Sequence, residues 1–285
     1  MQVPGLELLG QSLLSGLFIG GLYGLLGLGL SLSWGMLKQI NLAHFGLAFL
    51  GAYLTYQMSN SFGVDPMVTL VIIVPGFFLI GMAMHWVFAK FKVTPFNSLL
   101  VTFGLLAIIE SLIQYVWTAD YRKLESHYAE VKFKVGLFYI PLPELLTLLL
   151  ALALCVGTWV VLRYTSTGKA MRAMSENPRM AAAFGVNERM LALWLSGAAS
   201  AFAGVAGVCL ALSFTLAPSQ IYGWIGVVFS AVMIGGLGNP LGPLIAGIVI
   251  GLSEATTMAI TAPAWAPLVS FSLLIAVLLL RPGKI

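Results

Sequence analysis

The stretch QSLLSGLFIGGLYGLLGLGLSLSW, residues 11–34, decides the fold of this chain. It contains no Asp, Glu, Lys or Arg, and the nearest charged residues are Glu7 before it and Lys38 after it. About 20 apolar residues in a helix are enough to cross the hydrocarbon core of a bilayer. The stretch therefore predicts a membrane-spanning helix. Because no basic leader precedes it, we expect this helix to stay in the mature protein.

The composition of the whole chain indicates the same class. Of the 285 residues, 60% are hydrophobic and only 8% are charged, whereas about a quarter of the residues of a soluble domain are charged. The mean hydropathy is +0.99. Cys155 and Cys209 lie in apolar runs, which favours small buried side chains over a disulfide or a metal site. We predict an all-α integral membrane protein with a single transmembrane domain over residues 1–285.

Nine apolar segments predict a multi-span helical bundle, at 11–34, 42–58, 67–88, 98–117, 145–162, 190–214, 221–237, 241–260 and 265–280. With the N-terminus outside and the C-terminus cytoplasmic, ten of the fourteen Lys and Arg residues fall on the cytoplasmic side, as the positive-inside rule requires. That rule also explains the net charge of +4 without a nucleic-acid partner. The cytoplasmic set is Lys38, Lys90, Lys92, the basic residues of 163–189, Arg281 and Lys284, and the outer set is Arg122, Lys123, Lys132 and Lys134.

Residues 163–189, RYTSTGKAMRAMSENPRMAAAFGVNER, form a polar island between two apolar segments. Asn177 can cap a short helix there, Pro178 suits its first position, and Gly185 can end it in the left-handed conformation. Ala170 follows Lys169 where a nucleotide-binding P-loop needs Ser or Thr, so the island does not bind ATP in that way. We predict a cytoplasmic docking element that comprises Gly168, Lys169, Arg172, Glu176, Asn177, Pro178, Arg179, Ala182 and Gly185.

Two segments break helical regularity, 41–51 (NLAHFGLAFLG) and 235–243 (GGLGNPLGP). Irregular backbone at membrane depth is tolerated where protein or a water-filled cavity satisfies its polar groups. Both segments are candidates for a solute pathway or a hinge, and the second is equally well an ordinary turn. Asn41 and His44 either line the pathway or make structural hydrogen bonds that fix the start of a helix.

Ionisable residues are scarce within the spans, which favours an apolar or zwitterionic solute and disfavours ion coupling. Glu110 and Glu254 are the carboxylates, and each can face an aqueous pathway or be satisfied by a neighbouring helix; His44 and His85 are the histidines. No HExxH, GxSxG or Cys/His metal pattern occurs, so an enzyme is not expected. Glycines at four-residue spacing predict close helix contacts, and they are Gly16, Gly20, Gly24, Gly247 and Gly251. The similar glycine density of the first and eighth apolar segments is consistent with a trace of an internal repeat.

Several motifs resemble permease subunits of branched-chain amino acid ABC importers, the LivH type. The N-terminal signature is GMLKQINLAH at 35–44, followed by Gly51-Ala52-Tyr53. The other motifs follow in the same order as in the family: LLVTFGL at 99–105 with Glu110, GKAMRAMSENPRMAAAFGVN at 168–187, GGLGNPLGPLIAGIVIGLSE at 235–254, and RPG at 281–283. Phe45 and Gly46 depart from the family pattern, in which Gly and an acidic or small polar residue often follow the histidine. The sequence therefore leaves two alternatives for the solute: branched-chain amino acids, or urea, short amides or aromatic acids.

The resemblance implies a helical fold of about eight or nine spans, shared with sugar and vitamin B12 type permeases, in a bacterial inner membrane. It also implies a homologous second permease, two cytoplasmic ATPases that carry the ATP and Mg, and a periplasmic or lipid-anchored solute-binding protein. This chain would contact membrane lipid, bind no cofactor and work by alternating access. The implied pathway residues are Asn41, His44, Thr102, Glu110, Gly235 and Gly236.

Two other classes of membrane protein are alternatives to a permease. A self-sufficient channel or secondary carrier also suits glycine-rich broken segments, but the cluster of intramembrane carboxylates expected of it is absent from the sequence. A purely structural scaffold explains the glycines and leaves the capped helix of the island without a role.

Overall fold

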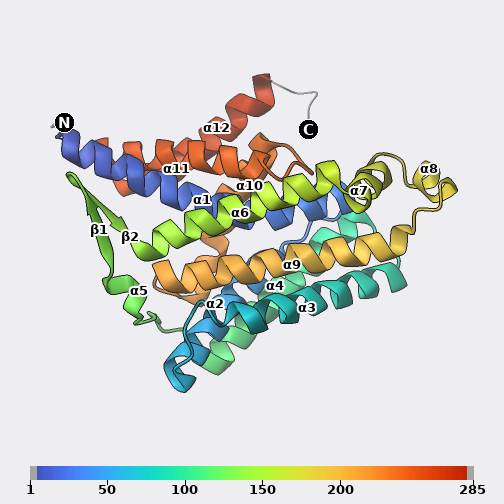
Figure 1. Ribbon diagram of the computed structural model, residues 1–285, viewed down its shortest axis with the longest axis horizontal. Helices are drawn as coiled ribbons and strands as arrows, with labels where there is room; N and C mark the ends of the chain where they lie inside the picture. Colours follow the sequence, from blue (N-terminus) through green and yellow to red (C-terminus); the bar gives the residue numbers. More distant parts are fainter. Residues whose placement is uncertain (1–4, 281–285) are drawn as a thin grey trace.

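The computed structural model describes residues 5–280, and most of its helices run roughly along one long axis (Figure 1). Its longer elements pack into a bundle, and its shorter ones lie toward the two ends. In chain order they are α1 (Leu6–Leu37), α2 (Ala43–Phe62), α3 (Leu70–Lys90), α4 (Pro95–Trp117), α5 (His127–Glu130), β1 (Lys132–Val135), β2 (Phe138–Pro141), α6 (Leu142–Tyr164), α7 (Ser166–Glu176), α8 (Pro178–Ala183), α9 (Glu188–Ser213), η1 (Pro218–Gln220), α10 (Ile221–Gly235), α11 (Gly242–Ile260), η2 (Pro263–Trp265) and α12 (Ala266–Leu280).

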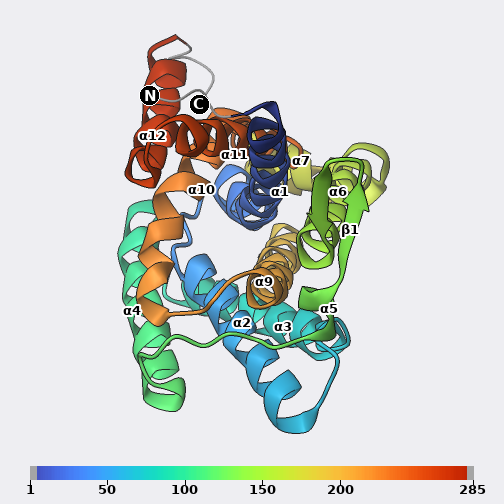
Figure 2. The same cartoon turned by 90° about the vertical axis from the view of Figure 1, so that its left-hand side faces the viewer.

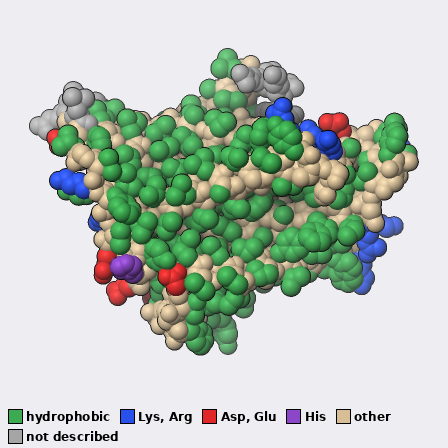
Figure 3. Space-filling model, in the orientation of Figure 1, with side chains coloured by type: hydrophobic (Ala, Val, Ile, Leu, Met, Phe, Trp, Pro, Cys, Tyr) green, Lys and Arg blue, Asp and Glu red, His purple; other side chains and the backbone are tan. Residues whose placement is uncertain are grey.

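Seven stretches of the described chain are long and apolar enough to cross a membrane: α1, α3, α4, α6, α9, α10 with its preceding 3-10 turn, and α11. This confirms the prediction of a multi-span helical membrane protein. The predicted count of nine spans also needs α2, with 20 residues, and α12, with 15. Hydrophobic side chains cover most of the face in Figure 3, and charged ones gather toward the ends of the long axis. That distribution suits a bundle crossing a bilayer along this axis.

Helices α1 and α9 form the centre of the bundle. Helix α1 packs against α6, α9, α10 and α11, and α9 packs against α2 and α3 as well. Figure 2 shows the two helices surrounded by the others. Both are apolar on every side because nearly every side is covered by protein, as at Leu25 and Leu28 of α1 and at Val208 and Leu210 of α9.

Helices α1 and α11 approach each other along a glycine seam. A Cβ atom added at Gly20 would lie 2.5 Å from the Ile248 Cα atom and 2.7 Å from the Gly247 carbonyl oxygen. A Cβ at Gly16 would lie 2.7 Å from the Gly251 carbonyl oxygen. These separations are too short for real side chains, so only glycine permits such close backbone contact. The seam consists of Gly16, Gly20 and Gly24 on α1 with Gly247 and Gly251 on α11.

The structure adds three short elements that the sequence analysis did not predict. An antiparallel hairpin, β1 and β2, occupies the loop between α4 and α6 and pairs Lys132 with Pro141 and Val135 with Phe138. Helix α5 precedes this hairpin, and helix α7 fills the first half of the polar island. Over residues 5–280 the chain is therefore helical with one small hairpin added. Arg281, Lys284 and the motif at 281–283 lie outside the described residues.

Candidate functional site

The turn between α1 and α2 is fastened to α4 by Thr102. The Thr102 hydroxyl donates to the Ile40 carbonyl oxygen at 3.1 Å and accepts from the Leu42 amide at 3.0 Å. Asn41 lies between those two residues, and its buried Oδ1 atom has no hydrogen-bond partner within residues 5–280. An unsatisfied buried acceptor is costly. Asn41 thus has an acceptor free for a partner or a solute.

His44 is almost fully buried and joins α2 to α1. Its Nε2 atom lies 2.9 Å from the Leu26 carbonyl oxygen. Because a carbonyl can only accept, this nitrogen carries the hydrogen. The ring packs directly on Gly29 of α1, where a Cβ atom would collide with it. For His44 the geometry favours the structural alternative over a pathway role.

Glu110 lies on a different level of α4 from Thr102, eight residues or about 12 Å further along the helix. One carboxylate oxygen accepts from the Tyr222 hydroxyl of α10 at 2.6 Å, and the other accepts from Gln114 at 3.1 Å. Glu110 is only half-buried, and Gln114 and Tyr115 beside it are exposed. A carboxylate at this depth is too costly to leave facing hydrocarbon. The surface formed by α4 and α10 around Glu110 therefore needs water or another protein against it.

Gly235 and Gly236 end α10 and begin a tight turn against α1. Gly236 has φ +89° and Gly238 has φ +77°, values that favour glycine. The Gly238 amide donates to Ser31 of α1, at 3.1 Å to both its carbonyl and hydroxyl oxygens. The turn is thus bonded to a fully buried residue of α1. Of the predicted pathway residues, Thr102 and Asn41 are brought together, whereas Glu110 bonds to α10 and the glycine turn bonds to α1.

The polar island projects from one end of the molecule as α7 and α8 (Figure 1). The Asn177 Oδ1 atom accepts from the Met180 amide at 3.1 Å and caps α8, which Pro178 begins. Gly185 has φ +82° just beyond the end of α8. Ala181 is buried, whereas Ala182 and the rest of the tip are exposed. The docking residues predicted around the tip therefore lie on an accessible helix.

Helix α7 holds this projection against the bundle. Thr165 caps it by accepting from the Gly168 amide at 3.0 Å. A Cβ atom at Gly168 would lie 2.5 Å from the Leu162 Cα atom of α6, so α7 and α6 are in backbone contact. Met171 and Met174 are buried beneath α7. The predicted docking residues Lys169, Arg172, Glu176 and Arg179 are exposed.

Two exposed apolar side chains were missed by the sequence analysis. Met180 is 56% exposed and Phe184 is 83% exposed, and both lie at the tip of the projection. Large apolar side chains on a protruding tip indicate contact with another protein. Their position next to the Asn177 cap was a signal that the sequence already contained.

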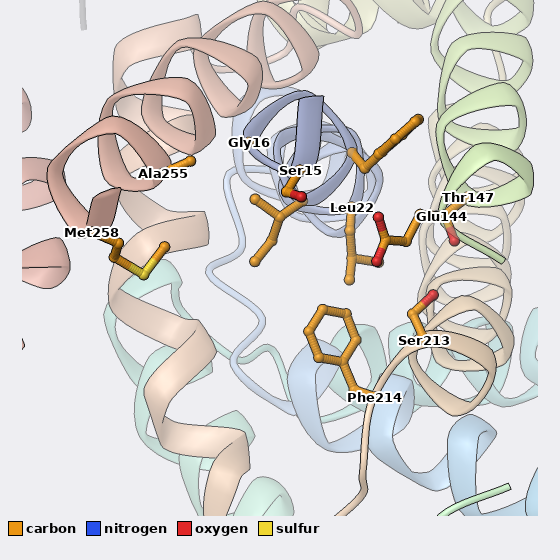
Figure 4. A pocket seen from close by; sticks show the side chains of 11 residues that line it. Ser15, Gly16, Leu22, Glu144, Thr147, Ser213, Phe214, Ala255 and Met258 are labelled. Carbon is orange, nitrogen blue, oxygen red and sulfur yellow. The ribbon is translucent and has the colours of Figure 1, made fainter. Parts of the chain in front are cut away.

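A cavity of about 160 Å³ lies between α1, α6, α9 and α11 (Figure 4). Glu144, in the first turn of α6, points into it beside Ser213 from the end of α9. The Ser213 hydroxyl is buried without a hydrogen-bond partner in the described part of the chain. Thr147 also lines the cavity, and its hydroxyl donates to the Pro143 carbonyl oxygen at 2.9 Å. The sequence analysis did not select Glu144, because a glutamate at the start of an apolar run resembles any charged helix end.

Membrane-length helices packed on a glycine seam, with a capped helical loop projecting from one end, define a multi-span helical membrane protein. Residues 12–278 match the family of permease components of branched-chain amino acid transport systems, and the chain belongs to that family. This confirms the resemblance drawn from the motifs.

Characterised relatives cover nearly the whole chain. The chain is 27% identical to LivH of Salmonella typhimurium and 28% identical to LivH of Escherichia coli, both high-affinity branched-chain amino acid transport system permease proteins. It is 22% identical to the permease protein BraD of Pseudomonas aeruginosa. Each alignment covers 96% of this chain and 94% of the relative. No solved structure matches the chain.

Proposed function

We propose that this chain forms one half of the membrane pathway of an ABC importer for branched-chain amino acids. The observation that carries the proposal is the family match over residues 12–278, since the relatives named above are permeases of that kind. The chain is a multi-pass protein of the inner membrane. Energy would come from hydrolysis of ATP, bound with Mg on two separate ATPases, so this chain itself would perform no catalysis.

The projecting α7 and α8 support contact with an ATPase. The contact surface would combine the apolar tip, Met180 and Phe184, with the exposed charges Arg172 and Arg179. An apolar anchor with cations on the same projection suits a cleft with acidic edges. Because α7 is in backbone contact with α6, motion of the ATPase would be passed into the spans.

The surface around Glu110 supports a second permease on α4 and α10. A homologous partner there would remove the half-buried carboxylate from lipid and place it at the seam between the two chains. A pathway along that seam would meet Glu110 and Tyr222, whose side chains are already hydrogen-bonded. Solute would be delivered from a binding protein at the end that holds the β-hairpin, with the N-terminus outside and the C-terminus in the cytoplasm.

Leucine uptake by the reconstituted importer tests the proposal. The importer would be the chain with its co-purified partners in liposomes, supplied with ATP inside and a binding protein outside. We expect leucine uptake that depends on ATP. Wild-type importer that takes up no branched-chain amino acid would contradict the proposed function.

Ala182→Arg tests the docking role of the tip. The new side chain should block seating of α8, so that the ATPase no longer co-purifies and uptake falls, while the membrane part stays folded. Ala129→Arg is the matched control, since it adds the same side chain to an exposed alanine of α5 at the opposite end of the molecule. Retention of the ATPase by Ala182→Arg at the wild-type level would rule out α8 as the docking element.

A further inference from the structure

We propose that the cavity beside Glu144 binds a branched-chain amino acid, with the ammonium group of the solute on the Glu144 carboxylate and its aliphatic side chain against the apolar wall. The inference rests on the proposed function and adds a solute site within one permease to the pathway between two. Three features of the cavity support it: its size, its lining and its position.

The size suits one small solute. The cavity volume of about 160 Å³ is more than ten times the roughly 10–15 Å³ of accessible space that one water molecule needs. Most of the wall is apolar, and its side chains include Phe18, Ile19, Leu22, Phe214 and Met258. Binding sites for small molecules commonly combine such a wall with a few polar groups that fix orientation. A branched aliphatic side chain would displace water from this wall at a gain in free energy.

The polar groups suit a zwitterion. Glu144 is half-buried, and no hydrogen bond or ion pair engages its carboxylate within residues 5–280. Lys132 of β1 is near enough to act on this carboxylate electrostatically, without contacting it in the described structure. An ammonium group offers three donors, which the Glu144 carboxylate and the Thr147 hydroxyl can accept. The free Ser213 hydroxyl can then donate to the carboxylate of the solute.

The position suits a solute arriving from the end that holds the β-hairpin. Helix α6 follows β2 directly, so Glu144 lies only three residues beyond the hairpin. The hairpin is in turn fastened to α1, because Gln11 accepts from the Tyr139 amide at 3.0 Å and donates to its carbonyl oxygen at 2.9 Å. The hairpin is therefore held near the start of α6, and none of its residues lines the cavity. A solute-binding protein that docks at this end would release its cargo close to Glu144.

The test measures equilibrium binding of radiolabelled leucine to the assembled importer, without ATP, in nanodiscs of phosphatidylcholine and phosphatidylglycerol. We expect wild type to bind leucine, and Glu144→Gln to weaken binding at least about tenfold because a charge-assisted hydrogen bond is lost. Glu130→Gln is the matched control: it neutralises an exposed carboxylate in α5, outside the cavity, and should bind as wild type does. 4-Methylpentanoate, which lacks the ammonium group, should not compete with leucine.

A second variant distinguishes loss of the binding site from a folding defect in Glu144→Gln. Ser213→Leu fills part of the cavity and leaves the Glu144 carboxylate intact, so it too should lose leucine binding while size-exclusion profile and ATPase retention stay as in wild type. Wild-type leucine affinity in both variants would overturn the inference. Displacement of leucine by phosphatidylethanolamine added to the nanodiscs would assign the site to a lipid headgroup and also overturn it. If uptake of leucine persists in either case, the proposed function still stands.

Discussion

A close backbone approach in the α1–α11 seam predicts that Gly20→Ala destabilises the protein. The new Cβ atom would lie 2.5 Å from the Ile248 Cα atom, 0.9 Å short of the 3.4 Å at which ordinary contact begins. Neither neighbour is a flexible side chain, so the two helices must move apart. Overpacking of this kind costs about 1–3 kcal/mol, which exceeds the gain of up to about 1 kcal/mol from the better helix propensity of alanine.

Gly157→Ala is the control for this prediction. Gly157 lies within α6 and has no atom within 4 Å of an added Cβ, so only the helix-propensity term applies there. The assay is thermal unfolding of both purified variants in one detergent. We expect Gly20→Ala to unfold several degrees below wild type and Gly157→Ala to unfold at or above it. Equal stability of the two variants would refute the argument from close helix contact.

Three further predictions concern Glu110, the orientation in the membrane and the contact between Tyr128 and Asp65. Glu110→Gln should reduce leucine uptake and leave ATPase co-purification unchanged; the measurement is uptake per assembled complex, and a wild-type rate would remove Glu110 from the pathway. Cysteines placed at Glu125 and Thr167 should react with impermeant reagents from opposite sides of the membrane, and labelling from one side would overturn the proposed orientation. Partial burial and the hydrogen bonds to Asp65 raise the pKa of Tyr128. The contact between α5, which holds Tyr128, and the α2–α3 loop, which holds Asp65, should therefore persist below about pH 10 and weaken as Tyr128 ionises above it. The test is the protease sensitivity of the α2–α3 loop measured against pH, and a sensitivity that does not change with pH would count against the prediction.

The spans and the α8 cap were predictable because their signals are local. A charge-free run reports burial in lipid without reference to any other segment, and Asn177, Pro178 and Gly185 specify both ends of α8 within nine residues. The spacing of Gly16, Gly20 and Gly24 likewise predicted a contact face. The identity of the facing helix was not predictable, because the seam joins segments more than 200 residues apart in the chain.

The elements that were missed depend on weaker or distant signals. Met171 and Met174 lie at helical spacing and are buried beneath α7. They were a local signal for α7, but only one helix was expected in the polar island and α7 was therefore missed. The hairpin has alternating apolar residues and a glycine with positive φ at Gly136. Because charged residues surround this pattern in the sequence, the segment resembled a plain loop. Glu144 could be recognised only after folding, because its cavity is shared among four helices.

The two proposed sites are connected by a single helix. Helix α6 is in backbone contact with α7 at Leu162 and carries Glu144 eighteen residues earlier, about 27 Å along its axis. A helix transmits displacement with little bending unless a proline, a bulge or an inserted group interrupts it, and the prolines of α6 and its boundary, Pro141 and Pro143, lie only at its start. A small shift of the docking element by the ATPases would therefore move the carboxylate relative to α1 and α9, which are fixed by their own packing. Solute affinity in the cavity and the affinity of the ATPases for ATP would then be coupled reciprocally, as the affinities of any two ligands that bias one pair of states must be.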